Sequence, residues 1–258
     1  MESFIQPELY RILTYGLQQD LPAYLQLGSQ FGAPILDLGA GLGRIGHALL
    51  KDGHSVVLLE KDPAYCHELQ HLCTHLTPTE QENCWIVNAD FTTEDWFATH
   101  KVLNDSSNSV PTKFGLIILG LRTIHLLSPI EQNAVLSNAI EHLHPNGALV
   151  IHHTTIEPNK ADSIWRLVAE HRTEDGILEV DECLKWNPST QQFALRHRIT
   201  QYSQRGQHVA QWRVAHDLHP LSALDLQQSL AEVGFESVQY QSLPDTDQLV
   251  IATLTPQS

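Results

Sequence analysis

The sequence has few of the features that mark secreted, metal-binding or membrane-spanning proteins. Its 258 residues include four cysteines, none in a Cys-x-x-Cys pair, which predicts buried reduced thiols rather than a disulfide framework. No apolar run approaches the roughly 18 to 20 residues of a membrane-spanning helix. The first residues, MESFIQPELYRIL, lack a basic segment followed by an apolar stretch. This argues against a secretory signal and predicts a cytoplasmic protein with no membrane partner.

Basic residues are also scarce. The chain has 15 Lys and Arg against 30 Asp and Glu, a formal net charge of -15 at pH 7. Such a surface repels phosphate backbones, and no Lys/Arg run supplies a basic patch, so we expect no nucleic-acid partner. The 16 histidines include no HExxH or similar ligand pattern. His152 and His153 are neighbours on a predicted strand and should point to opposite faces, so we expect no metal site.

Short apolar runs alternate with helical patterns between residues 34 and 154. This alternation predicts a parallel sheet with helices on both faces. Two closing strands joined by a short turn should pair antiparallel. The predicted fold is therefore α/β and doubly wound, with a mostly parallel seven-stranded sheet. Its predicted strands are Ile35–Leu38, Ser55–Glu60, Cys84–Asp90, Phe114–Gly120, Ala148–His152, Ser237–Leu243 and Leu249–Leu254.

The pattern changes after the fifth strand. Residues 177–218 contain three runs of strand type separated by turn signals. A stretch of about 40 residues is too short to hold a core alone, so we expect an antiparallel β insertion over residues 174–218. The prediction is a single domain over residues 1–258, which starts with a helical segment at residues 1–33.

A glycine-rich turn, DLGAGLG at residues 37–43, joins the first strand to a helix. Glycines there let the backbone approach a ligand and present N–H groups at a helix N-terminus. Two cofactor types use such a turn. GLGRIG at residues 41–46 satisfies the GxGxxG pattern, and Glu60 has a suitable spacing for a ribose hydroxyl. An NAD-dependent dehydrogenase is therefore one alternative.

Three features favour S-adenosylmethionine (SAM) instead. Asp37 ends the first strand, where a carboxylate suits the ammonium of SAM and would repel a pyrophosphate. Asn88-Ala-Asp90-Phe91 ends the third strand and offers an acid and an aromatic ring to an adenine. The chain then closes with a helix and an antiparallel strand pair, an ending that dinucleotide-binding folds do not usually carry.

Over nearly its whole length the chain resembles the class I SAM-dependent methyltransferases, and among them the bacterial small-molecule methyltransferases. The resemblance rests on ILDLGAGLGR, VVLLEKDP, NADF, FGLIILGLRTIHLL, HLHPNGALVI and LAEVGFESV in this order. The approach to the first strand, DLPAYL at residues 20–25, and WNPSTQQFALRHRITQYSQRG in the insertion match the bacterial type. The resemblance implies methyl transfer from SAM to an O or N atom, rather than C, of a small molecule, by a monomer or homodimer.

The resemblance also implies roles for single residues. Gly115 stands where the family usually has an acid, which keeps a catalytically silent SAM-binding partner subunit as an alternative. Tyr15 is expected at the carboxylate of SAM or at the acceptor, and the alternative is that it simply packs in the core. The implied sites are Asp37, Gly39, Ala40, Gly41 and Gly43 for the methionine part, Glu60 for the ribose, Lys61, Asp90 and Phe91 for the adenine, and Leu119 with Gly120 beside the sulfonium.

The acceptor side is less defined. The insertion is expected to form a lid over the acceptor, with Trp212 either contacting the acceptor or packing inside the lid. Arg122 is expected at the acceptor or at the carboxylate of SAM. An O or N acceptor needs a base, and histidine titrates near neutral pH. His125, just beyond the fourth strand, is the first candidate and His152 the second. The alternative for each is a structural, hydrogen-bonded histidine.

Overall fold

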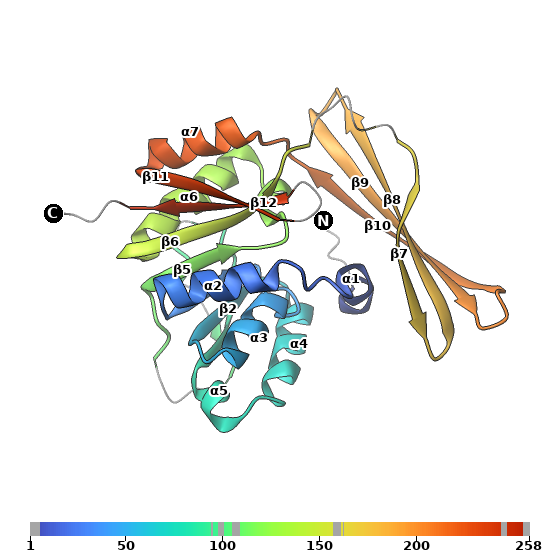
Figure 1. Ribbon diagram of the computed structural model, residues 1–258, viewed down its shortest axis with the longest axis horizontal. Helices are drawn as coiled ribbons and strands as arrows, with labels where there is room; N and C mark the ends of the chain where they lie inside the picture. The colour runs from blue at the N-terminus through green and yellow to red at the C-terminus, as the bar shows by residue number, and fades with distance from the viewer. Residues whose placement is uncertain are drawn as a thin grey trace. The chain divides into compact units, whose positions relative to one another are not determined.

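The computed structural model describes residues 6–93, 95–97, 101–104, 109–156, 161, 163–243 and 247–254. The chain divides into two compact units (Figure 1). Unit 1 comprises Met1–Thr154 and Ala223–Ser258, and unit 2 comprises Thr155–Ser222. The insertion predicted at residues 174–218 falls within unit 2, which starts earlier in the chain.

Unit 1 contains one sheet of eight strands in the order β11-β12-β6-β5-β1-β2-β3-β4. Pairings from β6 across to β3 are parallel, and β12 and β11 are antiparallel as predicted. The eighth strand, β4, is a two-residue antiparallel strand that the sequence pattern was too short to reveal. The bounds are β1 (Ile35–Leu38), β2 (Val56–Glu60), β3 (Cys84–Asn88), β4 (Lys101–Val102), β5 (Phe114–Leu119), β6 (Leu143–Thr154), β11 (Ser237–Ser242) and β12 (Asp247–Thr253).

Both faces of this sheet are buried. On one face, Tyr24, Leu49 and Leu69 from three helices form a core with alternate strand residues. The other strand residues, such as Leu36 and Leu59, are fully buried as well, as a doubly wound sheet requires. Helix α6 packs on α7 and on β6. The helices of unit 1 are α1 (Pro7–Thr14), α2 (Leu21–Phe31), α3 (Arg44–Lys51), α4 (Pro63–Cys73), α5 (Pro78–Glu82), the 3-10 helix η1 (Thr123–Leu126), α6 (Pro129–His142) and α7 (Ala223–Val233).

Local signals in the sequence explain where helices start. The Ser128 hydroxyl accepts the N–H of Glu131, and the Glu131 carboxylate accepts the N–H of Ser128. This reciprocal capping box, with proline at the first helical position, fixes the start of α6. Thr77 and Glu80 form a second capping box at α5.

Gly115, the position where the resemblance leads one to expect an acid, is explained by packing. A Cβ atom there would lie 2.5 Å from the carbonyl oxygens of both Phe31 and Gly32. The backbone after α2 passes so close to β5 that no side chain fits. The missing acid is therefore a consequence of this helix-to-strand connection and is no sign of a decayed site.

The strand order reverses beside β1, which has β2 on one side and β5 on the other. In open α/β sheets, ligands bind where the loops after two such strands diverge. The glycine-rich turn follows β1, and Gly120 follows β5. The candidate cofactor residues are thus at the place where this topology forms a binding crevice.

Unit 2 is an antiparallel sheet of four strands, β7 (Arg166–Thr173), β8 (Gly176–Asn187), β9 (Gln192–Ser203) and β10 (His208–Leu218), in the order β10-β9-β8-β7. The last three are the three predicted runs. β7 was missed because its sequence, RLVAEHRT, mixes charged and apolar residues without a clean alternation. Trp212, Ile199 and Val180 are neighbours across three strands and give the sheet an apolar face. Within the described part of the chain, no helix is long and apolar enough to cross a membrane.

Candidate functional site

The glycine-rich turn lies against a small cavity at the carboxyl ends of β1 and β5. Gly39, Gly41 and Gly43 have φ angles of 67°, 57° and 78°, a left-handed conformation that glycine adopts without strain. The cavity is about 30 Å³, room for only one or two waters. Its lining is Tyr10, Thr14, Asp37, Gly39, Ala40, Leu42, Arg44, Ile45, Gly120, Leu121 and Thr123.

Asp37 is a buried acid at this cavity. Its side chain accepts the backbone N–H of Gly46 at 3.1 Å, and the residue is 3% exposed. Burial raises the pKa of Asp37 to about 7, against the lowering effects of the Gly46 hydrogen bond and of Arg44. An acid kept this far from water is poised to pair with a cation entering the cavity.

Glu60 ends β2 and accepts a hydrogen bond from the glycine-rich turn. One carboxylate oxygen accepts the N–H of Gly41 at 2.9 Å, and the other accepts the N–H of Asp62 at 2.9 Å. Burial raises its pKa, and the hydrogen bonds from Asp62, Gly41 and Lys61 oppose that shift. Glu60 therefore shapes the glycine-rich turn directly, a contact that the sequence pattern did not indicate.

The predicted adenine-side residues come together at the ends of β2 and β3. The Lys61 ammonium lies 3.7 Å from the Asp90 carboxylate. Asp90 Oδ1 also accepts the N–H and the hydroxyl of Thr92, at 2.9 and 2.7 Å. The buried ring of Phe91 lies 3.2 Å from where a Cβ of Gly39 would be. Phe91 therefore links the end of β3 to the glycine-rich turn.

The tyrosine that lines this cavity is Tyr10, and the expectation for Tyr15 stays a prediction. Tyr15 is 67% exposed and does not line the cavity, because α1 ends at Thr14 and the chain turns away. The Tyr10 ring lies 3.4 Å from where a Cβ of Gly41 would be and packs edge-on against Tyr65 at 5.5 Å. Burial raises the pKa of Tyr10 to about 12.

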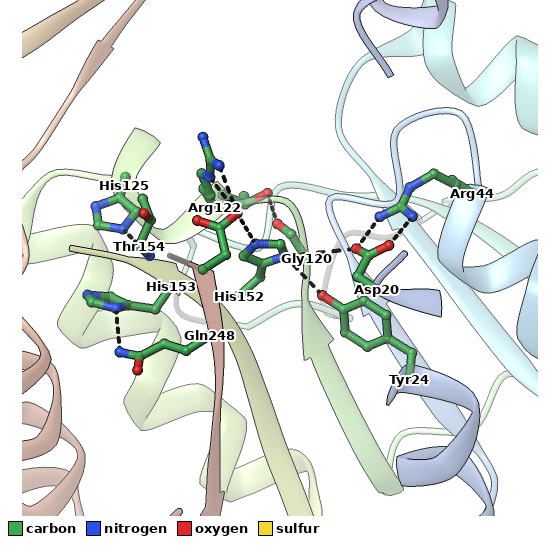
Figure 2. Close-up of polar contacts among 12 residues, drawn as sticks. Asp20, Tyr24, Arg44, Gly120, Arg122, His125, His152, His153, Thr154 and Gln248 are labelled. Atoms are coloured by element: carbon green, nitrogen blue, oxygen red, sulfur yellow. Dashed lines mark hydrogen bonds and ion pairs between the residues drawn. The ribbon is translucent and has the colours of Figure 1, made fainter. Parts of the chain in front are cut away.

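A chain of hydrogen bonds and ion pairs runs past the end of β6 (Figure 2). His152, 4% exposed, has Nε2 at 3.0 Å from Asp247 Oδ2 and Nδ1 at 3.4 Å from the Tyr24 hydroxyl. Its Nδ1 also lies 3.9 Å from Asp20. Arg122 donates to the same Asp247 oxygen from Nε and Nη2, at 3.1 and 2.7 Å. His152 thus sits between two carboxylates, each of which is held by an arginine.

Arg122 reaches Asp247 from an unusual backbone. Leu121 and Arg122 have φ angles of 44° and 60°, and consecutive non-glycine residues rarely adopt this region. Such conformations persist where the surroundings impose them and are concentrated at functional sites. Leu121 lines the cavity next to Gly120, and Arg122 binds Asp247. This turn therefore connects the wall of the cavity to Asp247.

His125, the first candidate base, points away from the cavity. The residue is fully buried, and its Nε2 accepts the backbone N–H of Thr154 at 3.4 Å. Its ring centroid lies 5.2 Å from that of His153, which bonds Gln248 at 3.1 Å. The interpretation of His125 as a base is therefore wrong, because the short η1 turn directs its ring into the core. His152 and His153 do point to opposite sides, as Figure 2 shows.

Comparison with known proteins rests on fold. No protein-family model matches the sequence, and no curated protein matches it. DesVI of Streptomyces venezuelae is 14% identical, with a TM-score of 0.73 over 98% of this chain and 99% of its own. SAM-bound CalS10, an amino pentose methyltransferase of Micromonospora echinaspora, is 15% identical, with a TM-score of 0.73 over 98% of each chain. KedS8, a sugar N-methyltransferase of Streptoalloteichus, is 16% identical, with a TM-score of 0.71 over 98% and 94%.

The fold is that of SAM-dependent methyltransferases. In this methyltransferase fold, the predicted residues Asp37, Gly39 and Ala40 line the cavity, while Leu119 is fully buried beside it. Trp212 lies in unit 2, on the apolar face of β10. Its proposed contact with an acceptor stays a prediction.

Sequence reasoning missed Arg44 at the cavity. Its guanidinium binds Asp20 twice, at 2.5 and 2.7 Å, and donates to the Leu17 carbonyl at 2.9 Å. Arg44 is the first residue of α3, where its positive charge opposes the helix dipole. An arginine directly after Gly43 therefore indicates that a nearby acid compensates this charge. Asp20 supplies that acid from the residue before α2.

Proposed function

We propose that this protein is a SAM-dependent methyltransferase that acts on an O or N atom of a small molecule. The observation that carries the proposal is Asp37, a buried carboxyl group directly beside the glycine-rich turn. A carboxylate attracts the ammonium of SAM and would repel the pyrophosphate of NAD at that place. The GxGxxG pattern is no argument for NAD, because its last glycine, Gly46, is required by packing. The Leu58 side chain leaves no room for a Cβ there.

The residues at the cavity fit the methionine part of SAM. Arg44 Nε is buried and has no hydrogen-bond partner among the described residues. A buried donor of this kind is costly unless an acceptor arrives, and the carboxylate of SAM is a suitable one. Asp37 would then hold the ammonium, with the N–H groups of the glycine-rich turn alongside.

The small size of the cavity assigns a role to Tyr10. Its ring covers Gly41, and a cofactor of the size of SAM needs far more space than about 30 Å³. We propose that α1 moves to admit the cofactor and that Tyr10 packs on it afterwards. Glu60 would bind the ribose hydroxyls, and Lys61, Asp90 and Phe91 would surround the adenine.

The bound cofactor supplies a methyl group already activated on a sulfonium, so alignment and exclusion of water account for much of the rate. The protein must also take up the acceptor's proton. Asp247 Oδ1 is buried without a partner among the described residues, and we propose that it accepts an N–H or O–H of the acceptor. His152, 3.0 Å from the same carboxylate, replaces His125 as our candidate base.

CalS10 is an amino pentose methyltransferase, and KedS8 is a sugar N-methyltransferase. These two neighbours support an amine on a sugar-like molecule as the acceptor.

Calorimetry with SAM and with NAD, in separate titrations, tests the proposal. We expect SAM to bind and NAD to give no heat of binding, and we expect the Gly41→Arg variant to bind neither. Binding of NAD alone would replace the proposal with a dehydrogenase. Methyl transfer to glucosamine, with N-acetylglucosamine as the matched control that lacks a free amine, tests the acceptor class in wild type and His152→Ala.

A further inference from the structure

Two buried cysteines of unit 1 are in contact. Cys73 ends α4 and Cys84 starts β3, and their Sγ atoms lie 3.2 Å apart. Cys73 is 8% exposed and Cys84 is fully buried. We propose that this pair is an oxidation site, which a peroxide converts to an intramolecular disulfide. The inference does not depend on the proposed function.

The surrounding structure already holds the two sulfurs together. Between them, the Gln81 side chain donates to the carbonyls of Cys73 and Leu76, each at 3.1 Å. The Asn83 carbonyl, just before Cys84, accepts the N–H of Val56 at 2.8 Å. A bonded S–S distance is about 2.05 Å, so closure requires the two sulfurs to approach by roughly one more ångström.

The contact makes the two thiols unequal. A thiol–thiol hydrogen bond, in which either sulfur can donate, joins the two side chains. This contact lowers the pKa of Cys73 and raises the pKa of Cys84. Cys73 is also the more exposed of the two. Because the thiolate is the nucleophile, Cys73 is the sulfur that attacks and Cys84 the one that resolves.

The chemistry balances with a peroxide as oxidant. The Cys73 thiolate attacks one oxygen of hydrogen peroxide, the O–O bond breaks, and hydroxide leaves, which produces a sulfenic acid. The Cys84 sulfur then attacks the Cys73 sulfur, the S–O bond breaks, and the hydroxyl leaves as water with the Cys84 proton. The hydroxide of the first step becomes water with the proton that Cys73 lost. In total two thiols are oxidised by two electrons, and one peroxide is reduced to two waters.

The other cysteines provide the contrast. Cys66, also on α4, donates to the Glu60 carbonyl and accepts from Asn88, both at 3.4 Å. Burial raises the pKa of Cys66 to about 11, and neither of these two contacts is with a thiol. Cys183 belongs to unit 2. The site is therefore specific to one pair among four cysteines.

A disulfide here would tie α4 to β3. The Leu69 and Leu72 side chains of α4 pack where a Cβ of Gly43 would be, and β3 ends at Asn88, two residues before Asp90. Oxidation would thus link α4 and β3 covalently, and both elements border the glycine-rich turn. The closed loop is short, and a native-like disulfide of this kind should raise Tm by roughly 5 to 10 °C.

The test is peptide mapping of the full-length protein after treatment with stoichiometric hydrogen peroxide and alkylation of the remaining thiols. Cleavage after glutamate separates residues 61–68, 69–80 and 83–94, each with one cysteine. We expect the second and third peptides to be recovered as one disulfide-linked species that dithiothreitol dissociates. Tm should rise in wild type and in the matched control Cys66→Ser, and it should stay unchanged in Cys73→Ser and Cys84→Ser.

Recovery of both cysteines alkylated after peroxide treatment would overturn the proposal. So would sulfinic acid at Cys73 without the linked peptides, because it would show that Cys84 does not resolve the sulfenic acid. Linkage of Cys66 to either cysteine would contradict the assignment of the pair. If a serine variant fails to fold, peptide mapping of the wild type still decides between these results.

Discussion

His152 Nε2 and Asp247 Oδ2 lie 3.0 Å apart, although 95 positions separate the two residues in the sequence. Burial opposes ionisation of Asp247, yet hydrogen bonds from His152 and Arg122 outweigh it and lower its pKa to about 2. The carboxylate therefore stays charged and keeps one oxygen for a further donor. This pair connects the predicted acceptor side to the last strand of the sheet.

Asp247→Asn should lower the free energy of unfolding by roughly 2 kcal/mol at neutral pH. The folded pKa lies below the ordinary value, so the stabilisation is present above about pH 4 and is lost as the pH falls toward 2. Denaturant titrations across this range should show wild type and variant converging at the acid end. Asp217→Asn is the matched control, because Asp217 is 59% exposed in its ion pair with Arg196 and should cost less than about 1 kcal/mol. A constant difference between Asp247→Asn and wild type at all pH values would contradict this account.

Asp37 should make stability depend on pH in the opposite sense from Asp247, and it should make cofactor binding depend on pH as well. Its folded pKa of about 7 lies above the ordinary value, so the folded protein loses stability as the pH rises from about 4 to 7. Asp37→Asn should raise the free energy of unfolding by roughly 2 to 4 kcal/mol near pH 8 and by little near pH 4. SAM affinity of the wild type should increase as the pH rises through about 7, with proton release on binding, and the Asp37→Asn variant should not bind SAM.

Denaturant titrations measure the stability difference, and calorimetry in buffers of different ionisation enthalpy measures the proton release on SAM binding. A binding heat that does not vary with the buffer would mean that Asp37 is already ionised in the free protein. SAM affinity retained in the Asp37→Asn variant would remove the ammonium assignment.

Gly41→Arg should abolish SAM binding without unfolding the protein, because a side chain there meets the Tyr10 ring at 3.4 Å and enters the cofactor path. Gly53→Arg is the matched control. Gly53 also has a positive φ, 89°, but nothing lies within 4 Å of its added Cβ. Both variants should lose roughly 1 to 2 kcal/mol of stability through backbone strain, and only the first should lose binding. Equal SAM affinity for the two variants would place the cofactor elsewhere.

Glu60→Ala should weaken SAM binding by roughly 1.5 to 3 kcal/mol, about ten- to a hundred-fold in Kd. It should also lower the free energy of unfolding, because the N–H groups of Gly41 and Asp62 lose their acceptor. Glu60→Gln keeps an acceptor oxygen and should recover more stability than affinity. An unchanged Kd in both variants would contradict the assignment to the ribose.

Much of the fold could be predicted because its signals are local. The capping box at Ser128, the glycine-rich turn and the alternating residues around Trp212 each lie within one short segment. The missed features are contacts between distant segments or weak patterns. Arg44 meets Asp20, Asp247 meets His152, and Tyr10 covers Gly41, all through folding that no spacing rule anticipates. His125 failed as a base for the same reason, since position after a strand does not fix the direction of a ring.

The distribution of the site along the chain also sets an order for its completion during synthesis. Every residue that lines the cofactor cavity occurs between Tyr10 and Thr123, whereas Asp247 belongs to the last strand. A growing polypeptide can therefore assemble the cofactor crevice while the ribosome is still translating unit 2. His152 gains Asp247 as a partner only when β12 has emerged and inserted beside β6. The ability to hold a cofactor would thus precede, by about half of the translation time, the ability to use it.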